Sequence, residues 1–220
     1  MFSFSEENYL KAIFHLQKKY SGGVSTNALA EQMETKASSV TDMVKKLSDK
    51  ELVKYKKYQG VKLSEKGKKT AVEVIRKHRL WEVFLVDKLN FSWDEVHDIA
   101  EQLEHIKSAK LTNELDNFLG NPKRDPHGDP IPDAQGNFRI ANNLLLADLE
   151  KGQTGVCVGV KDSSTEFLRY LDKNHIALGK QIHIVYKEEY DKSLLVKIDD
   201  KELLISHTVS NNLFVKPIES

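Results

Sequence analysis

Apolar residues recur at helical spacing through the first fifty positions. The pattern predicts a helix over residues 6–20 that ends at Gly22-Gly23, and a second helix over 27–33. A third helix is predicted to start at an N-cap, Ser38, and to reach residue 49. Its apolar positions follow an i, i+3, i+4, i+7 spacing and comprise Val40, Met43, Val44 and Leu47. Two helices joined by a tight turn predict a helix-turn-helix.

The next segment alternates apolar residues with lysines. Residues 52–63 predict two strands, and Gly60 can supply the turn between them. Ser64 is then expected to cap a helix over residues 65–89, and another helix is expected over 93–107. A lysine-rich hairpin after a helix-turn-helix is typical of a wing that lies along a phosphate backbone.

Proline divides the chain. Four of its five prolines fall within residues 122–132, so the stretch around them cannot hold a continuous helix or a central strand. Beyond this stretch, alternating runs predict strands, and residues 165–172 predict a helix. We expect a mainly α chain with a small β domain, divided into residues 1–72, 73–120, a Pro/Gly-rich linker over 121–143, and 144–220.

Charge changes this picture because the neutral total conceals two opposite segments. Residues 1–72 carry a net charge of +6, with fourteen lysines and no arginine, whereas residues 73–120 carry −4. The single cysteine, Cys157, excludes a disulfide framework and is expected to be a buried structural thiol. No apolar run is long enough to span a membrane, so a cytoplasmic protein is expected.

The basic segment favours nucleic-acid binding. Small hydroxyl side chains suit close approach to bases and phosphates, and lysines suit the phosphate backbone. The candidate DNA-binding residues are Lys36, Ser38, Ser39, Thr41, Asp42, Lys45, Lys46, Lys57 and Tyr58. The alternative is an ordinary helical domain with a solvated lysine face, but the wing and the local charge favour the first interpretation.

The acidic segment offers metal ligands on the predicted helices. They are His78, Glu82, His97, Glu101, Glu104 and His105. Imidazole and carboxylate ligands together suit Mn²⁺, Fe²⁺ and the later divalent transition metals. The alternative is a solvated acidic face paired with Arg76, Lys77 and Arg79.

With these motifs placed, the chain resembles the diphtheria-toxin-repressor family of metal-dependent transcriptional repressors, and most closely its three-domain, manganese-responsive branch. The resemblance is carried by Glu7-Asn8-Tyr9-Leu10, Ser38-Ser39-Val40-Thr41, Met43-Val44-Lys45-Lys46-Leu47, Leu63-Ser64-Glu65-Lys66-Gly67, Arg76-Lys77-His78-Arg79-Leu80, Val96-His97, Leu103-Glu104-His105 and the prolines from Pro122 to Pro132. It implies a winged helix-turn-helix, a helical dimerisation domain and a C-terminal SH3-like β-barrel.

The resemblance also implies two metal sites. The regulatory ion would be held by Asn8, His78, Glu101, Glu104 and His105. Asn8 stands where relatives carry Asp or Met, and Lys11 stands where some carry a Glu for a second ion, which argues against a two-metal cluster. Glu101 replaces a Cys of iron-responsive members, and an oxygen ligand favours Mn²⁺.

The second implied site would draw on Glu82, Asp125 and His127, with Asp162 as the acid of the third domain. In iron-responsive members, His78 and His97 serve this site with Glu82. For Asp125 and His127 the alternative is simple solvation of a loop.

The expected function is a Mn²⁺-dependent repressor, with Fe²⁺ as the alternative ion and other divalent metals as binders in vitro. As a homodimer it would bind a palindromic double-stranded DNA operator. The apolar residues Phe84, Leu85, Trp93, Val96, Ile99 and Leu111 are expected at the subunit interface. No bond is made or broken, so an enzyme is not expected.

Two other functions remain open on the sequence alone. One is a metal-binding adaptor or storage module that recruits a protein through its SH3-like domain. The lysines of the basic segment, residues 1–72, argue against this function. The other is a metallohydrolase, which the lack of an obvious general base outside the ligand set disfavours.

Overall fold

The computed structural model describes residues 2–20, 22–56, 59–138 and 144–218. It divides into two compact units. The first comprises Met1–His78, Glu101–Asn113 and Pro132–Asn137, and the second comprises Arg79–Ala100, Glu114–Ile131 and Phe138–Ser220. None of the helices in the described ranges is long and apolar enough to cross a lipid bilayer.

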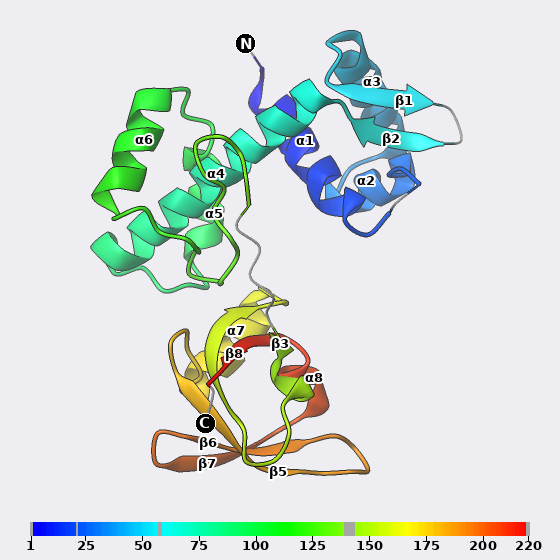
Figure 1. Ribbon diagram of the computed structural model, residues 1–220. Coiled ribbons are helices and arrows are strands. Elements are labelled where there is room, and N and C mark those ends of the chain that lie inside the picture. The colour runs from blue at the N-terminus through cyan, green and yellow to red at the C-terminus, as the bar shows by residue number, and fades with distance from the viewer. Residues whose placement is uncertain (1, 21, 57–58, 139–143, 219–220) are drawn as a thin grey trace. The chain divides into compact units, whose positions relative to one another are not determined.

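The first unit contains a winged helix-turn-helix (Figure 1). Its elements are α1 (Phe4–Gln17), α2 (Thr26–Gln32), α3 (Ala37–Asp49), β1 (Val53–Lys56), β2 (Gly60–Leu63) and the start of α4 (Glu65–Leu89). The predicted stripe of α3 is confirmed, because Val40, Val44 and Leu47 are fully buried and Met43 is partly buried. They pack with Leu10 and Ile13 of α1, so the first and third helices share one core.

Side-chain caps explain where most of these helices begin. Ser3 and Glu6 form a capping box at α1, Ser25 accepts the Ala28 N–H at α2, and the predicted cap Ser64 accepts the Gly67 N–H at 3.0 Å. The predicted cap of α3 is wrong. Lys36 occupies the cap position without a side-chain bond, and Ser38 lies inside the first turn.

Gly67 has a packing reason for its place in the first turn of α4. A Cβ added there would lie 1.9 Å from the carbonyl oxygen of Leu52. The same carbonyl accepts the Ser64 N–H at 3.0 Å. Only glycine lets the helix start this close to the end of α3, which fixes the wing against the long helix.

The helices after α4 differ from expectation. The predicted helix over 93–107 is shorter, because α5 spans Val96–Leu103 and the Ile106 N–H donates to the Leu103 carbonyl at 3.2 Å. Glu104 and His105 therefore lie in a turn, not on a helical face. A further helix, α6 (Ala109–Phe118), was not predicted. Leu85 and Val96, expected at a subunit interface, are buried within the chain.

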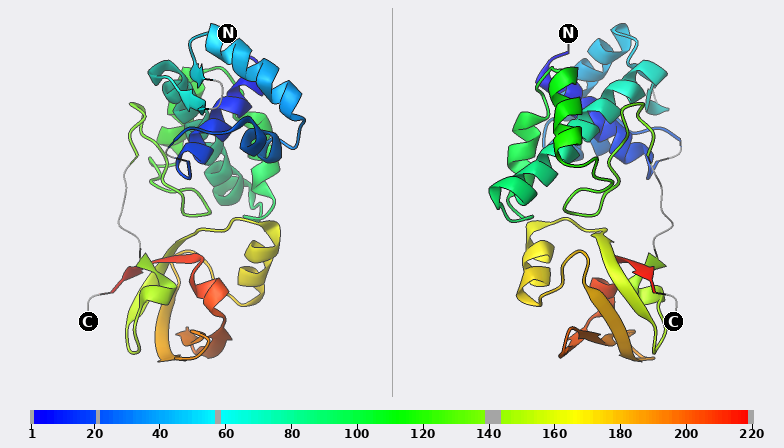
Figure 2. Two further views of the ribbon diagram at one scale, coloured as in Figure 1. Left: turned by 90° about the vertical axis from the view of Figure 1, so that its right-hand side faces the viewer. Right: turned by 60° about the vertical axis from the view of Figure 1, so that its left-hand side comes forward.

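The second unit ends in an antiparallel sheet (Figure 2). The strand order in this sheet is β3-β8-β4-β5-β6-β7. Its elements are β3 (Leu144–Leu145), the 3-10 helix η1 (Leu146–Asp148), β4 (Thr154–Val160), α7 (Thr165–Lys173), β5 (Gln181–Lys187), β6 (Leu194–Ile198), β7 (Lys201–Ile205), α8 (His207–Ser210) and β8 (Leu213–Pro217). The SH3-like β domain and the helix at 165–172 are confirmed, but the described strands form an open sheet and not a closed barrel.

The core of this sheet is apolar and includes the only cysteine. Leu168 and Leu171 of α7 pack with strand residues such as Ile182 and Val215. Cys157 is buried as predicted, and burial raises the pKa of its thiol to about 11. The thiol is therefore protonated and packs as a small apolar group.

Glu6 forms ion pairs that join α1 to the end of α3. Its Oε1 lies 2.6 Å from Lys50 Nζ and 3.1 Å from Lys46 Nζ. Burial alone would raise its pKa, but Lys50, the Ser3 N–H and Lys46 outweigh burial and lower the pKa to about 2. The resulting stabilisation is complete above the ordinary pKa near 4.5 and is lost as the pH falls towards 2.

We therefore expect Glu6→Gln to lower the free energy of unfolding at pH 7 by on the order of 1–2 kcal/mol. The difference from the wild type should shrink when the pH is lowered from 7 to 3.5, as measured by urea unfolding followed by circular dichroism. Glu31→Gln, at an exposed position of α2, is the matched control and should change little. A difference that is equal at both pH values would contradict this role of Glu6.

Candidate metal centre and nucleic-acid interface

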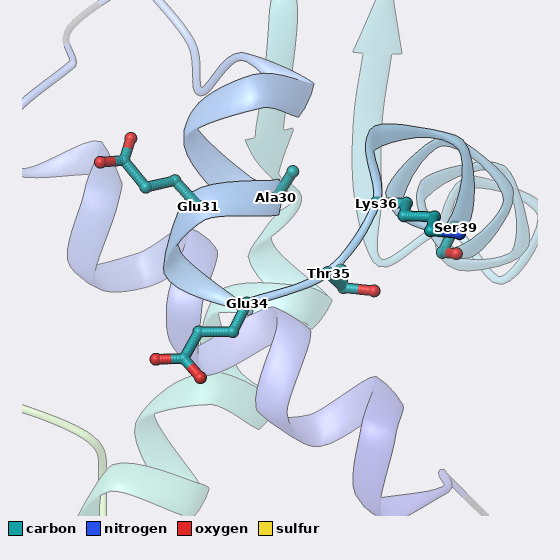
Figure 3. A pocket seen from close by; sticks show the side chains of 6 residues that line it. All are labelled: Ala30, Glu31, Glu34, Thr35, Lys36 and Ser39. Atoms are coloured by element: carbon teal, nitrogen blue, oxygen red, sulfur yellow. The ribbon is translucent and has the colours of Figure 1, made fainter.

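The predicted DNA-binding residues of α3 form an exposed surface at its amino end. Lys36, Ser38, Ser39, Asp42 and Lys45 are exposed, whereas Thr41 is half-buried and its hydroxyl donates to the Ala37 carbonyl at 2.8 Å. In Figure 3, the side chains of Lys36 and Ser39 lie together at the start of α3, and those of Glu31 on α2 and Glu34 in the turn after it lie apart from them. The residues shown line a hollow of about 610 Å³ between α2 and α3.

Two of the predicted DNA-binding lysines form ion pairs within the chain. Lys46 Nζ lies 3.1 Å from the buried Glu6, and Lys45 Nζ lies 3.6 Å from Asp42. Lys46 therefore has a structural partner, whereas the Lys45 pair is exposed and easily exchanged. Lys57 and Tyr58 lie outside the described residues.

The wing places lysines directly opposite each other. In the register of β1 and β2, Lys54 pairs with Lys62, and both side chains are exposed. Like charges in such a pair destabilise the hairpin unless an anion lies near them. A nucleic-acid backbone would supply phosphate anions, so this pair supports the nucleic-acid interpretation.

The first cluster of candidate ligands joins α1 to the turn after α5, within the first unit. Glu7 Oε2 lies 2.6 Å from His105 Nδ1, and Phe4 stacks on the same imidazole at 4.5 Å between ring centroids. Glu104 lies beside it with a fully buried side chain. One oxygen of Glu104 is 2.6 Å from His78 Nδ1, and the other is 3.9 Å from His105 Nε2.

Lys11 also enters this cluster. Its ammonium lies 2.8 Å from both oxygens of Glu104 and 3.1 Å from Oε1 of Glu101. Burial by itself would raise the pKa of Glu104, but the hydrogen bond with His78 and the charge of Lys11 lower the pKa below its usual value. Glu104 is therefore held as a carboxylate, the form that ligates a metal ion.

Asn8 carries the most direct sign of a missing partner. Its Oδ1 is buried and has no hydrogen-bond partner among the described residues. Asn8 lies on α1 between Glu7 and Lys11, the two residues that reach the cluster. An amide oxygen deprived of water and of donors is costly, and a cation would satisfy it. The oxygen and imidazole groups of this cluster therefore fit a divalent ion.

The second cluster lies within the second unit, and it brings ligand atoms of three residues together as a set. One ligand atom each from Glu82, Asp125 and His127 lies within 4.8 Å of the others, and all three side chains are buried. Glu82 Oε2 lies 3.6 Å from His127 Nδ1, and Glu82 Oε1 lies 3.6 Å from Nδ1 of the exposed His97.

Neighbouring groups hold this second cluster in place. Arg79 Nε lies 3.3 Å from Asp125 Oδ2, and Asp125 Oδ1 accepts the His127 N–H at 2.9 Å. Nε2 of His127 lies 2.7 Å from the Trp93 carbonyl oxygen, so Nε2–H donates there and Nδ1 faces Glu82. This arrangement leaves one imidazole nitrogen available to a metal ion.

Protons compete for the same groups. Burial and repulsion from Glu82 raise the pKa of Asp125 despite the opposing charge of Arg79. Burial alone would lower the pKa of His127, but the Glu82 carboxylate outweighs burial and raises the pKa to about 9. At neutral pH, without a bound cation, this cluster therefore carries protons.

The predicted fourth ligand, Asp162, does not meet the ligand atoms of Glu82, Asp125 and His127. It is half-buried, and its Oδ1 accepts the Ser164 N–H at 2.9 Å in a local turn. The first cluster likewise does not bring the ligand atoms of Glu101, Glu104 and His105 within 4.8 Å of one another as a set, as far as the described residues show.

Arg79, named from the sequence only as a possible ion-pair partner of the acidic face, pairs instead with Asp125. Two participating residues had no role assigned from the sequence: Glu7, and Lys11 as a direct partner of the ligands. Glu7 and Lys11 are four positions apart, so the sequence indicates that they share a helical face with Asn8 beside them. The sequence did not indicate the partners of Glu7 and Lys11, which lie about ninety or more positions later in the chain.

The fold and the two clusters place the chain in the class of winged-helix proteins that carry histidine–carboxylate sites in the helices after the wing. Three family models match in succession. Residues 1–61 match the iron-dependent repressor N-terminal DNA-binding domain, 64–133 match the iron-dependent repressor metal-binding and dimerisation domain, and 144–217 match the FeoA domain.

Individual relatives agree with the family models. The chain is 35% identical over 159 residues to the iron-dependent repressor IdeR of Mycobacterium leprae, covering 70% of this chain and 68% of that protein. It is also 35% identical to IdeR of Mycobacterium tuberculosis over 127 residues, covering 57% of this chain and 54% of the relative. The match thus spans about half the length of that relative.

Solved structures extend the similarity to the third domain. A manganese-dependent transcriptional repressor in complex with manganese aligns with a TM-score of 0.84 and 34% identity, covering 97% of this chain and 100% of that one. The manganese regulator SloR aligns with a TM-score of 0.72 and 31% identity, covering 97% and 98%. The chain therefore belongs to the iron-dependent repressor family of metal-dependent transcriptional repressors, whose members are not enzymes.

The raised pKa values of the second cluster predict that metal binding there releases protons, because the ligating His127 and Asp125 must be deprotonated. We expect Mn²⁺ affinity at this cluster to rise as the pH is raised from 6 to 8. Calorimetric titration in buffers of different ionisation enthalpy measures the protons released.

Glu82→Gln should remove that proton release, and Asp162→Asn should leave it as in the wild type, because Asp162 lies outside the cluster. Equal proton release from the wild type and from Glu82→Gln would contradict a metal site at these residues.

Proposed function

We propose that this chain is a metal-dependent transcriptional repressor that binds a palindromic DNA operator as a cytoplasmic homodimer, with Mn²⁺ as its regulatory ion. Fe²⁺ is the alternative ion. The observation that carries the proposal is the buried, unsatisfied Asn8 Oδ1 on a helix whose neighbouring residues reach Glu101, Glu104 and His105. The metal site thereby includes part of the DNA-binding domain.

The residues that would hold the regulatory ion are Asn8, His78, Glu101, Glu104 and His105. When bound, the ion would supply positive charge. Ligands from α1 and from the turn after α5 would then coordinate the same ion. Oxygen and imidazole groups without a thiolate suit Mn²⁺ better than softer ions. Metal dependence in manganese-bound and iron-dependent relatives supports this assignment.

An ion bound through α1 can affect the winged helix-turn-helix, because α1 is part of the core of that domain. Leu10 and Ile13 of α1 pack with Val44 and Leu47 of α3, and Glu6 is ion-paired with Lys46 and Lys50. An ion that restrains α1 would therefore also restrain α3, the helix that carries most of the candidate DNA-binding residues. A ligand strengthens DNA binding when it binds better to the DNA-competent arrangement than to the others.

A dimer is supported by apolar surface in the helical segment. Phe118 is 65% exposed and Leu111 is 41% exposed, and Trp81 and Phe84 are only partly buried. The family model for residues 64–133 describes a dimerisation domain. A two-fold dimer would present two α3 helices to two half-sites of a palindrome.

Glu82, Asp125 and His127 would hold a second ion, with His97 as an outer ligand because it already contacts Glu82. Since these groups lie within the second unit, we assign this site a structural role in that unit. Asp162 has no support from the geometry as a ligand to this ion.

Metal dependence of DNA binding is the first test. A duplex from the region upstream of the protein's own gene serves as the probe in fluorescence anisotropy. We expect Mn²⁺ to tighten binding by about 10–100-fold over chelator. Glu104→Gln should abolish most of this gain, because it removes the carboxylate that contacts both His78 and Lys11. Glu114→Gln, at an exposed position of α6, should retain the gain. Equal wild-type affinity with Mn²⁺ and with chelator would refute the proposal.

The wing provides a second test. Lys54→Gln combined with Lys62→Gln should weaken binding to all duplexes and reduce the slope of log affinity against log salt by about 2, one for each lost phosphate contact. The control is Lys151→Gln with Lys201→Gln, two exposed lysines of the third domain. An unchanged salt slope in the wing variant would mean that the hairpin does not touch the backbone.

A further inference from the structure

A hollow of about 770 Å³ in the first unit has no part in the function proposed above. Its walls come from one face of α4, the turn after α5, the start of α6 and residues 133–137, and Glu7 of α1 also lines it. All of these segments belong to the first unit. The volume falls in the range that is typical of small-molecule sites in proteins.

Positive side chains predominate in the walls of this hollow. The lining cations are Lys68, Lys69, Arg76, Lys77 and Lys107, and the lining acids are Glu7, Glu65, Glu73 and Asp133. Two of these acids are already engaged. Glu7 Oε2 lies 2.6 Å from His105 Nδ1, and Asp133 Oδ1 accepts two backbone N–H groups of its own turn, each at 2.9 Å. The hollow therefore presents five cations against the two remaining carboxylates.

The lysines of α4 are not paired with the acids beside them. The seven lining positions of α4, from 65 to 77, follow helical spacing, so Lys69 and Lys77 each lie one turn from Glu73. Within the described ranges, however, Lys68, Lys69 and Glu73 form no ion pair. The hydrogen bond from Lys77 Nζ to the Ile106 carbonyl is long, at 3.5 Å. An anion in the hollow would therefore meet ammonium groups that lack a close counter-charge.

Arg76 and the start of α6 add donors that suit an oxyanion. The Arg76 side chain is buried, and its Nη1 donates to Asn113 Oδ1 at 3.1 Å, which fixes the guanidinium against α6. A planar guanidinium matches the geometry of phosphate oxygens. Helix α6 is ten residues long, and Ser108, Ala109 and Thr112 at its amino end line the hollow. The partial positive charge of a helix amino end adds to that of the lysines.

We propose that this hollow binds the phosphate group of a small molecule, at a site distinct from the DNA-binding surface and from the two clusters of candidate metal ligands. The lining also includes the apolar side chains of Val72, Ile106 and Ala109, which would contact the organic part of such a molecule. A bound phosphate would join α4 to α6 and to residues 133–137. The proposal does not depend on the proposed function, since it requires neither a metal ion nor DNA.

The probe is inorganic pyrophosphate, titrated into the full-length protein by calorimetry at physiological ionic strength. A chelator is present so that no divalent ion bridges the probe to a carboxylate. We expect one saturable site per subunit. Lys69→Gln combined with Lys77→Gln should weaken binding by about 10-fold or more, because it removes two charge-assisted contacts.

Two further pairs of lysines serve as comparisons with the same loss of charge. Lys151→Gln with Lys201→Gln, at exposed positions of the third domain, should keep the wild-type affinity for pyrophosphate. Lys54→Gln with Lys62→Gln should also keep it, which distinguishes the hollow from the wing as the place where the probe binds.

Three results would overturn the proposal: no saturable binding to the wild type, wild-type affinity in the folded Lys69 and Lys77 variant, or an equal loss of affinity in the wing variant. If the Lys69 and Lys77 variant does not fold, as judged by circular dichroism, Lys68→Gln with Lys107→Gln replaces it under the same criteria. Both of these residues are exposed and line the same hollow.

Discussion

The structure of the first unit depends on one buried carboxylate. Glu104 has no exposed side-chain surface, yet it is held ionised by His78 of α4 and by Lys11 of α1. A buried charge must be compensated locally, since its desolvation costs several kcal/mol. Because its two partners come from helices far apart in sequence, compensating Glu104 also fixes those helices against the turn after α5. The carboxylate proposed as a metal ligand is in this way also a group that organises the fold.

Helix α1 connects that carboxylate to the DNA-binding surface. One face of α1 lies in the apolar core with α3, and other positions, Glu7 and Lys11, reach the cluster. Glu6 adds two ion pairs to α3 itself. A single helix of fourteen residues thus takes part in the core, the ion pairs and the first cluster of candidate ligands. Small changes at the cluster cannot be absorbed locally, because packed cores are not continuously deformable.

Local signals allowed most of the helical elements to be predicted. Ser64 and the apolar period defined α4, and Asn90, with a φ of 59°, ends it in the left-handed conformation that asparagine tolerates. The end of α5 could not be predicted, because the apolar period continues to Ile106 while Glu104 and His105 are turned by contacts with His78 and Glu7. The ligand types were visible in the sequence. The role of Lys11 was not, because its contacts join positions ninety and ninety-three residues apart.

The two clusters differ in how their negative charge is compensated, and this difference separates their chemistry. In the first cluster, Lys11 contacts Glu104 directly and the carboxylate stays ionised, so a metal ion meets a ligand that is already deprotonated. In the second, Arg79 contacts Asp125 at one oxygen only, Glu82 repels it, and His127 takes up a proton with a pKa of about 9. A metal ion must displace protons there. An ion at the first cluster would therefore not have to displace a proton from Glu104, whereas occupancy of the second is tied to both metal and pH. The cluster whose carboxylate is already ionised is also the one that includes α1.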